Sequence, residues 1–97
     1  MTALPPMHPG ELLREDILPA LGKPVSDVAA LLGVSRQALH GLLAEKAAVT
    51  PAMALRLGKL CGNGPDLWLT LQARHDLARL RREMAAEIER IPTLDAA

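Results

Sequence analysis

A polar segment near the middle of the chain carries the side chains with the most distinctive chemistry. Ser35, Arg36, Gln37 and His40 fall within one short stretch, and Lys46 follows soon after them. An arginine can donate two parallel hydrogen bonds to guanine, and a glutamine can pair in the same way with adenine. A histidine can reach a base edge or a phosphate, and a lysine ammonium is attracted to the phosphate backbone. These residue types at this spacing predict contacts with double-stranded DNA.

The other reactive residues do not form a pattern typical of an enzyme or a metal site. Ser35 has no base beside it, and His40 points to a different side of the same predicted helix. His8, His40 and His75 are far apart in the sequence, so we expect surface or capping roles for them. The single cysteine, Cys61, lacks partners for a disulfide or a metal, and we expect it to be buried and unreactive. We therefore expect no enzymatic activity, no metal and no cofactor.

The segment of residues 25–45 predicts two short helices joined by a tight hinge. We expect Ser26 to cap the first helix and Ser35 to cap the second. Between them, Gly33 can adopt the left-handed conformation that ends a helix, and Val34 can fill the angle between the two helices. Helices that cross steeply leave the first turn of the second one exposed, where it can enter a DNA major groove. The alternative is an ordinary helical hairpin with a polar outer face.

Capping residues and prolines predict three more helices around this segment. An N-cap residue or a proline in the first turn favours the start of a helix, and a glycine after the last apolar position favours its end. One predicted helix starts at Pro9 and ends between Pro19 and Gly22. A second starts at Thr50-Pro51 and ends at residues 62–64, and a third starts at Pro65. No segment alternates as a strand does. We therefore expect an all-α fold with five helices in residues 9–75.

A stripe of large apolar residues continues beyond the fifth predicted helix. Leu77, Leu80, Met84 and Ile88 recur at the spacing of a helix that packs along another helix. Charged residues fill the positions between them, and a lone helix would expose the stripe to water. We therefore expect residues 78–91 to form a C-terminal helical extension that holds a homodimer together. Residues 1–7 and 92–97 are expected to be flexible ends.

Composition fits one small helical domain that resides in the cytoplasm. The chain has 97 residues, 49% of them hydrophobic, with no Phe or Tyr to favour strands. No apolar run is long enough for a membrane span, and the N-terminus lacks the pattern of a secretory signal. The balanced charges of residues 77–91 disfavour a membrane-surface helix. Net charge is zero overall, but it is −2 for residues 1–34, +3 for residues 35–60 and −1 for the remainder.

Five sequence motifs in a fixed order extend this interpretation. The hinge and the helix after it, GVSRQALHGLL, resemble the helix-turn-helix of phage repressors such as those of lambda and 434. The longer pattern resembles the HigA-type antitoxins. The matching motifs are HPGELLRE at 8–15, LG at 21–22, LGVSRQ at 32–37, TPAMALRLGK at 50–59 and PDLWLTLQA at 65–73. The resemblance covers residues 8–77, which we take as the helix-turn-helix domain.

The resemblance implies a five-helix, lambda-repressor-like domain that binds operator DNA as a dimer and represses its own operon. It also implies a partner, a small HigB-type mRNA endonuclease toxin that the protein neutralises. Ser35, Arg36 and Gln37 match the DNA-contacting first turn of the recognition helix, and His40 matches its exposed face. This chain departs from the family pattern after Leu43: the family usually has Asn-Gly-Lys where this sequence reads AEK at 44–46.

Two other functions stay open from the sequence alone. The first is a toxin-binding interaction module of the same fold that no longer binds DNA, which the zero net charge and Glu45 favour. The second is a stand-alone helix-turn-helix regulator without a toxin. The intact hinge and the Ser35-Arg36-Gln37 turn favour DNA binding over the interaction module.

Overall fold

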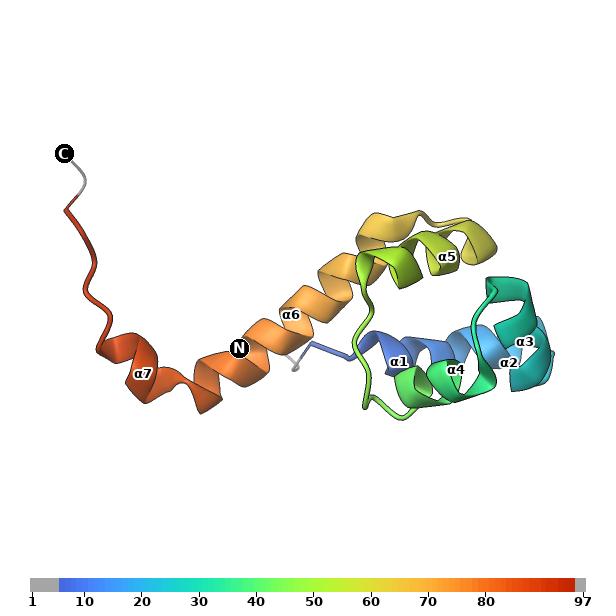
Figure 1. Cartoon of the computed structure of the whole chain (residues 1–97), viewed down its shortest axis with the longest axis horizontal. Helices are drawn as coiled ribbons and strands as arrows, with labels where there is room; N and C mark the ends of the chain where they lie inside the picture. The colour runs from blue at the N-terminus through green and yellow to red at the C-terminus, as the bar shows by residue number, and fades with distance from the viewer. Residues whose placement is uncertain (1–5, 96–97) are drawn as a thin grey trace.

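The structure, a computed structural model, describes residues 6–95 and is all-helical over that range (Figure 1). The first helix runs without a break through α1 (Pro9–Leu12), η1 (Leu13–Ile17) and α2 (Leu18–Leu21). It is followed by α3 (Val25–Leu32), α4 (Arg36–Leu43), α5 (Pro51–Cys61), α6 (Pro65–Glu83) and α7 (Ala85–Glu89). The first helix and α3–α5 form a bundle with the start of α6, and the rest of α6 leads away from it to α7. The predicted all-α fold and its helical extension are confirmed.

The first helix continues past Pro19 because its middle segment, η1, is a π-helical turn. The N–H of Leu18 bonds to the carbonyl of Leu13, five residues earlier. A proline has no N–H to donate, and its ring crowds the carbonyl four residues before it. The wider π turn therefore carries the chain through Pro19, and the helix ends only at Gly22, where φ is +64°.

Side-chain caps begin two of the later helices where the sequence predicted them. Ser35 Oγ accepts a hydrogen bond from the N–H of Ala38 at 3.0 Å, and Thr50 Oγ1 accepts one from Met53 at 3.2 Å. The predicted cap at Ser26 is wrong. The backbone of Pro24 is extended and its carbonyl accepts from two N–H groups of the first turn, so α3 begins at Val25 and contains Ser26.

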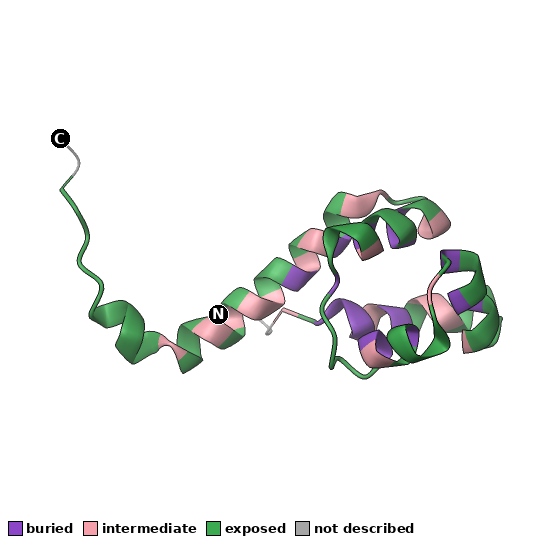
Figure 2. Ribbon diagram, in the orientation of Figure 1, coloured by how far each residue is buried: buried purple, intermediate pink, exposed green. Residues whose placement is uncertain are grey.

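Each helix of the bundle contributes to one apolar core (Figure 2). Trp68 is fully buried, and its indole N–H donates to Asn63 at 3.1 Å. The other buried apolar residues are Leu13, Val28, Ala29, Leu32, Leu39, Leu42, Leu43, Val49, Ala54 and Leu57. Burying a large side chain contributes roughly 1.5–3 kcal/mol, so this set is the main source of stability for the bundle. Cys61 is only partly buried, at the edge of the core, which corrects the prediction that it is buried.

Candidate nucleic-acid interface

The α3–α4 pair has the geometry of a helix-turn-helix. Gly33 ends α3 with φ at +74°, and the N–H of Val34 bonds back to the carbonyl of Ala29 at 3.0 Å. Val34 packs against the core from the angle between the helices, and Ser35 caps α4. The hinge therefore turns the chain within three residues and fixes the direction of α4.

The first turns of α4 present the predicted contact residues to solvent. Ser35, Arg36, Gln37 and His40 are all exposed, whereas the opposite face of the helix packs into the core. The structure thus brings these four residues together on one surface. Lys46 is also exposed, but it lies beyond the far end of α4, in the loop that leads to α5. Lys46 is therefore placed for a contact separate from those of the first turn.

Arg56 fixes the hinge from α5, a role that the sequence did not reveal. Its Nη1 donates to the carbonyl of Leu32 at 2.6 Å and lies 3.4 Å from the carbonyl of Gly33. A Cβ atom on Gly33 would lie 2.7 Å from the same nitrogen. Arg56 therefore satisfies carbonyls at the end of α3, which have no partner within the helix.

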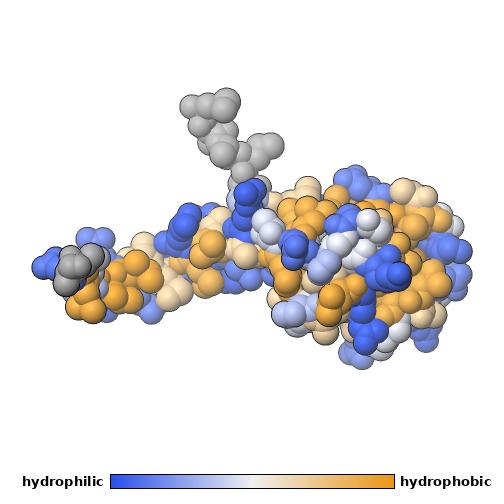
Figure 3. All heavy atoms as spheres, turned by 90° about the horizontal axis from the view of Figure 1, so that it is seen from above, coloured by the Kyte–Doolittle hydropathy of each residue, from blue (hydrophilic) through white to orange (hydrophobic). Residues whose placement is uncertain are grey.

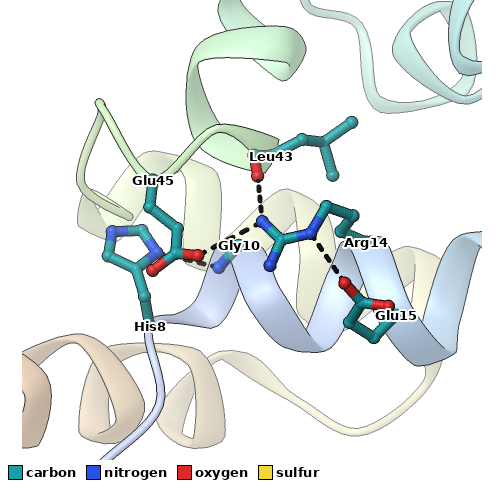
Figure 4. A network of polar contacts seen from close by, with 6 residues as sticks. All are labelled: His8, Gly10, Arg14, Glu15, Leu43 and Glu45. Carbon is teal, nitrogen blue, oxygen red and sulfur yellow. Dashed lines mark hydrogen bonds and ion pairs between the residues drawn. The ribbon is translucent and has the colours of Figure 1, made fainter.

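Arg14 of η1 holds the C-terminal end of α4 (Figure 4). Its Nη1 donates to the carbonyl of Leu43 at 2.7 Å and to Glu45 Oε2 at 3.2 Å, and its Nε donates to Glu15 at 2.9 Å. The hydrogen bonds to Glu15 and Glu45 raise the pKa of Arg14. The first helix is in this way tied to the recognition helix and to the loop that follows it.

His8 caps α1 and contacts a second histidine. The Nδ1 atom of His8 accepts a hydrogen bond from the N–H of Gly10 at 2.9 Å, so the proton of the neutral ring lies on Nε2. The rings of His8 and His75 meet edge to face with centroids 5.0 Å apart, although the two residues are distant in the sequence. Burial is the main cause that lowers the pKa of His8, and His75 lowers it further. Within residues 6–95, no three possible metal ligands are grouped.

Gly10 and Gln72 complete the packing around α4 and its loop. A Cβ atom on Gly10 would collide with the carbonyl of Leu42, so only a glycine allows α1 to approach α4 this closely. Gln72 of α6 is buried, and its side-chain carbonyl accepts from the N–H of Val49 at 2.8 Å. No pattern in the sequence singles out these residues or Arg14, but all of them lie within the motifs HPGELLRE and PDLWLTLQA.

The part of the chain from Leu77 to the end of α7, here called the C-terminal arm, carries an apolar stripe that is open to solvent in the single chain. Leu77, Leu80, Met84 and Ile88 line one groove with Arg81, where α6 meets α7. Leu77 and Ile88 are 51% and 52% exposed, and apolar side chains are visible along the arm in Figure 3. No helix within the described residues is both long and apolar enough to cross a membrane.

The hinge, the fixed direction of α4 and its exposed first turn define a helix-turn-helix protein. The chain is 34% identical to the HTH-type transcriptional regulator YbaQ of Escherichia coli (strain K12), over 92% of this chain and 80% of that protein. It superposes on the antitoxin GraA in complex with its operator with a TM-score of 0.87 and 33% identity, over 99% of this chain and 98% of that one. It superposes on Pseudomonas aeruginosa antitoxin HigA with the higBA promoter with a TM-score of 0.84 and 28% identity, over 93% of this chain and 99% of that one.

The chain belongs to the HigA-type antitoxin family of helix-turn-helix regulators, as its motifs predicted. No protein-family model matches it. The relatives are antitoxins and transcriptional regulators and not enzymes, in agreement with the sequence-based prediction.

Proposed function

We propose that this protein binds operator DNA as a homodimer, represses its own operon and neutralises a small mRNA endonuclease toxin of the HigB type. The observation that carries the proposal is the first turn of α4, where Arg36 and Gln37 are exposed. Arg56 holds the hinge that precedes this helix, and Arg14 holds its C-terminal end. Relatives that share this fold were observed with operator or promoter DNA. Such a repressor would act in the cytoplasm.

The contacts divide into those that read the sequence and those that hold the backbone. Arg36 and Gln37 have the hydrogen-bonding groups that distinguish guanine and adenine in the major groove. Ser35 and His40 flank them and can reach phosphate or a base edge. Lys46 lies past the C-terminal end of α4 and supplies a phosphate contact that does not depend on sequence.

The homodimer would form through the C-terminal arm. We assign residues 8–77 to the DNA-binding domain and residues 78–91 to the dimerisation extension. A second copy would cover Leu77, Leu80, Met84 and Ile88, which otherwise stay open to water. Two-fold symmetry would then present two α4 helices to half-sites about 34–36 Å apart, one turn of the duplex.

A gel shift with the DNA upstream of this gene tests DNA binding, and co-expression with a small neighbouring toxin gene tests neutralisation. Binding to the upstream duplex with rescue of growth supports the full proposal. Rescue without a shift would favour the alternative, a toxin-binding module that no longer binds DNA. That alternative is supported by the zero net charge and by Glu45 beside Lys46. A shift without any toxin gene would favour a stand-alone regulator.

A further inference from the structure

Glu45 occupies a backbone conformation that glutamate rarely adopts. Its φ is +60°, and it is the one non-glycine residue with positive φ among residues 6–95. In this left-handed region the Cβ of an L residue crowds the following carbonyl, which glycine avoids. Glutamate at this position therefore adds both backbone strain and a negative charge beside Lys46.

The carboxylate of Glu45 is directed to the first helix. Arg14 Nη1 lies 3.2 Å from Glu45 Oε2 and also donates to the carbonyl of Leu43, in the last turn of α4 (Figure 4). A helix C-terminus carries partial negative charge and leaves its last carbonyls without partners, so a guanidinium there is favourable. One nitrogen of Arg14 therefore serves both the end of the recognition helix and the acid that follows it.

We propose that Arg14 and Glu45 form an electrostatic latch that sets the DNA affinity of this protein. Arg14 holds the Glu45 carboxylate against the first helix and compensates its charge, so that the neighbouring Lys46 stays available to phosphate. Without Arg14, the carboxylate is free to pair with Lys46 and to repel the DNA backbone. Arg14 is then a positioning residue that acts through Glu45. The inference rests on the proposed DNA binding of this chain.

The latch predicts that the effect of removing Arg14 depends on Glu45. The variants are Arg14→Gln, Glu45→Gln and the double substitution, each measured by fluorescence anisotropy on a duplex of the upstream DNA. Arg14→Gln should raise the Kd by roughly threefold to tenfold, and the increase should shrink at higher salt. In the Glu45→Gln background the same substitution should change the Kd by less than about twofold, because no carboxylate remains to be released. The charge-matched control is Arg74→Gln, which removes an exposed arginine of α6 that lies outside the proposed dimerisation extension.

The outcomes separate the latch from a structural role and from a direct contact of Arg14 with DNA. Equal weakening by Arg14→Gln in both backgrounds would overturn the latch, as would no weakening in either. If Arg14→Gln does not fold, the Glu45→Gln variant alone tests the latch. Its Kd should stay within about twofold of wild type. An increase in DNA affinity of more than about fivefold would show that the carboxylate is not shielded and would overturn the latch. Failure of the wild-type protein to bind the duplex would overturn the proposed function, and the latch with it.

Discussion

Gln72 of α6 accepts a hydrogen bond at 2.8 Å from the backbone N–H of Val49, and both residues are buried. Val49 lies near the end of the loop that joins α4 to α5, the loop in which Lys46 also lies. The amide N–H of Gln72 donates in turn to Asp76 at 3.0 Å, which fixes the orientation of the side chain. The loop that follows the recognition helix is therefore held by a side chain of α6.

Replacing Gln72 by leucine should destabilise the protein without changing the volume of the core greatly. The N–H of Val49 would be left buried without an acceptor, which costs about 1–3 kcal/mol. Urea denaturation of Gln72→Leu should show that loss, whereas Gln37→Leu at an exposed position should stay within about 0.5 kcal/mol of wild type. Equal stabilities for the two variants would show that the hydrogen bond contributes nothing.

Position 45 should prefer glycine over alanine. Both Glu45→Gly and Glu45→Ala remove the ion pair with Arg14, but only glycine relieves the strain at φ +60°. We expect the glycine variant to be more stable than the alanine variant by roughly 1 kcal/mol in the free energy of unfolding. An alanine variant as stable as the glycine variant, in the same urea titration, would contradict the strained conformation.

Stability should fall as the pH drops through the titration of His8. The folded state lowers the pKa of His8 from 6.5, chiefly by burial and also by His75, while Glu45 and Asp76 oppose the shift. The neutral ring therefore favours folding: its contribution is complete above pH 6.5 and is lost as the pH falls through the folded-state pKa. Protonation of Nδ1 would also break the cap at Gly10.

The control for this pH dependence is His8→Asn, because asparagine can still cap a helix but does not titrate. Thermal unfolding between about pH 7.5 and pH 5.5 should show a steeper loss for wild type than for His8→Asn. Parallel pH profiles for the two proteins would contradict the role of His8.

The dimer can be tested with two matched leucine substitutions. Leu77→Asp places a charge in the apolar groove of the arm, and Leu55→Asp places one on α5, where Leu55 is 63% exposed. Sedimentation velocity at micromolar concentration should find Leu77→Asp monomeric and Leu55→Asp dimeric like wild type, because a charge is costly in a buried interface. A dimer that survives Leu77→Asp would place the interface elsewhere.

Local signals in the sequence predicted most of the fold. Gly33, Ser35 and Thr50 mark helix ends through interactions with residues close to them in the chain, and such local interactions can be predicted from a single sequence. The π turn before Pro19 was not predicted, because a proline normally marks a helix end. The start of α3 was misplaced because the Pro24 carbonyl opens the helix without a side-chain cap.

The contacts around the recognition helix could not be predicted from the sequence and were found only in the structure. Arg14 and Leu43 are 29 positions apart, and Gln72 and Val49 are 23 apart. Contacts of this kind depend on how the helices pack, which periodicity and capping do not specify. The same holds for the pairing of His8 with His75, which the spacing in the sequence argued against.

The most direct test of the account is whether α4 reads the operator. Fluorescence anisotropy should compare Gln37→Ala and Lys46→Ala on the upstream duplex and on a scrambled duplex at several salt concentrations. Gln37→Ala should cost roughly 1–3 kcal/mol on the operator and almost nothing on the scrambled duplex. Lys46→Ala should weaken binding to both duplexes alike and reduce the salt slope by about 1. Operator binding by Gln37→Ala and Arg36→Ala that equals wild type would contradict the assignment of α4 as the recognition helix.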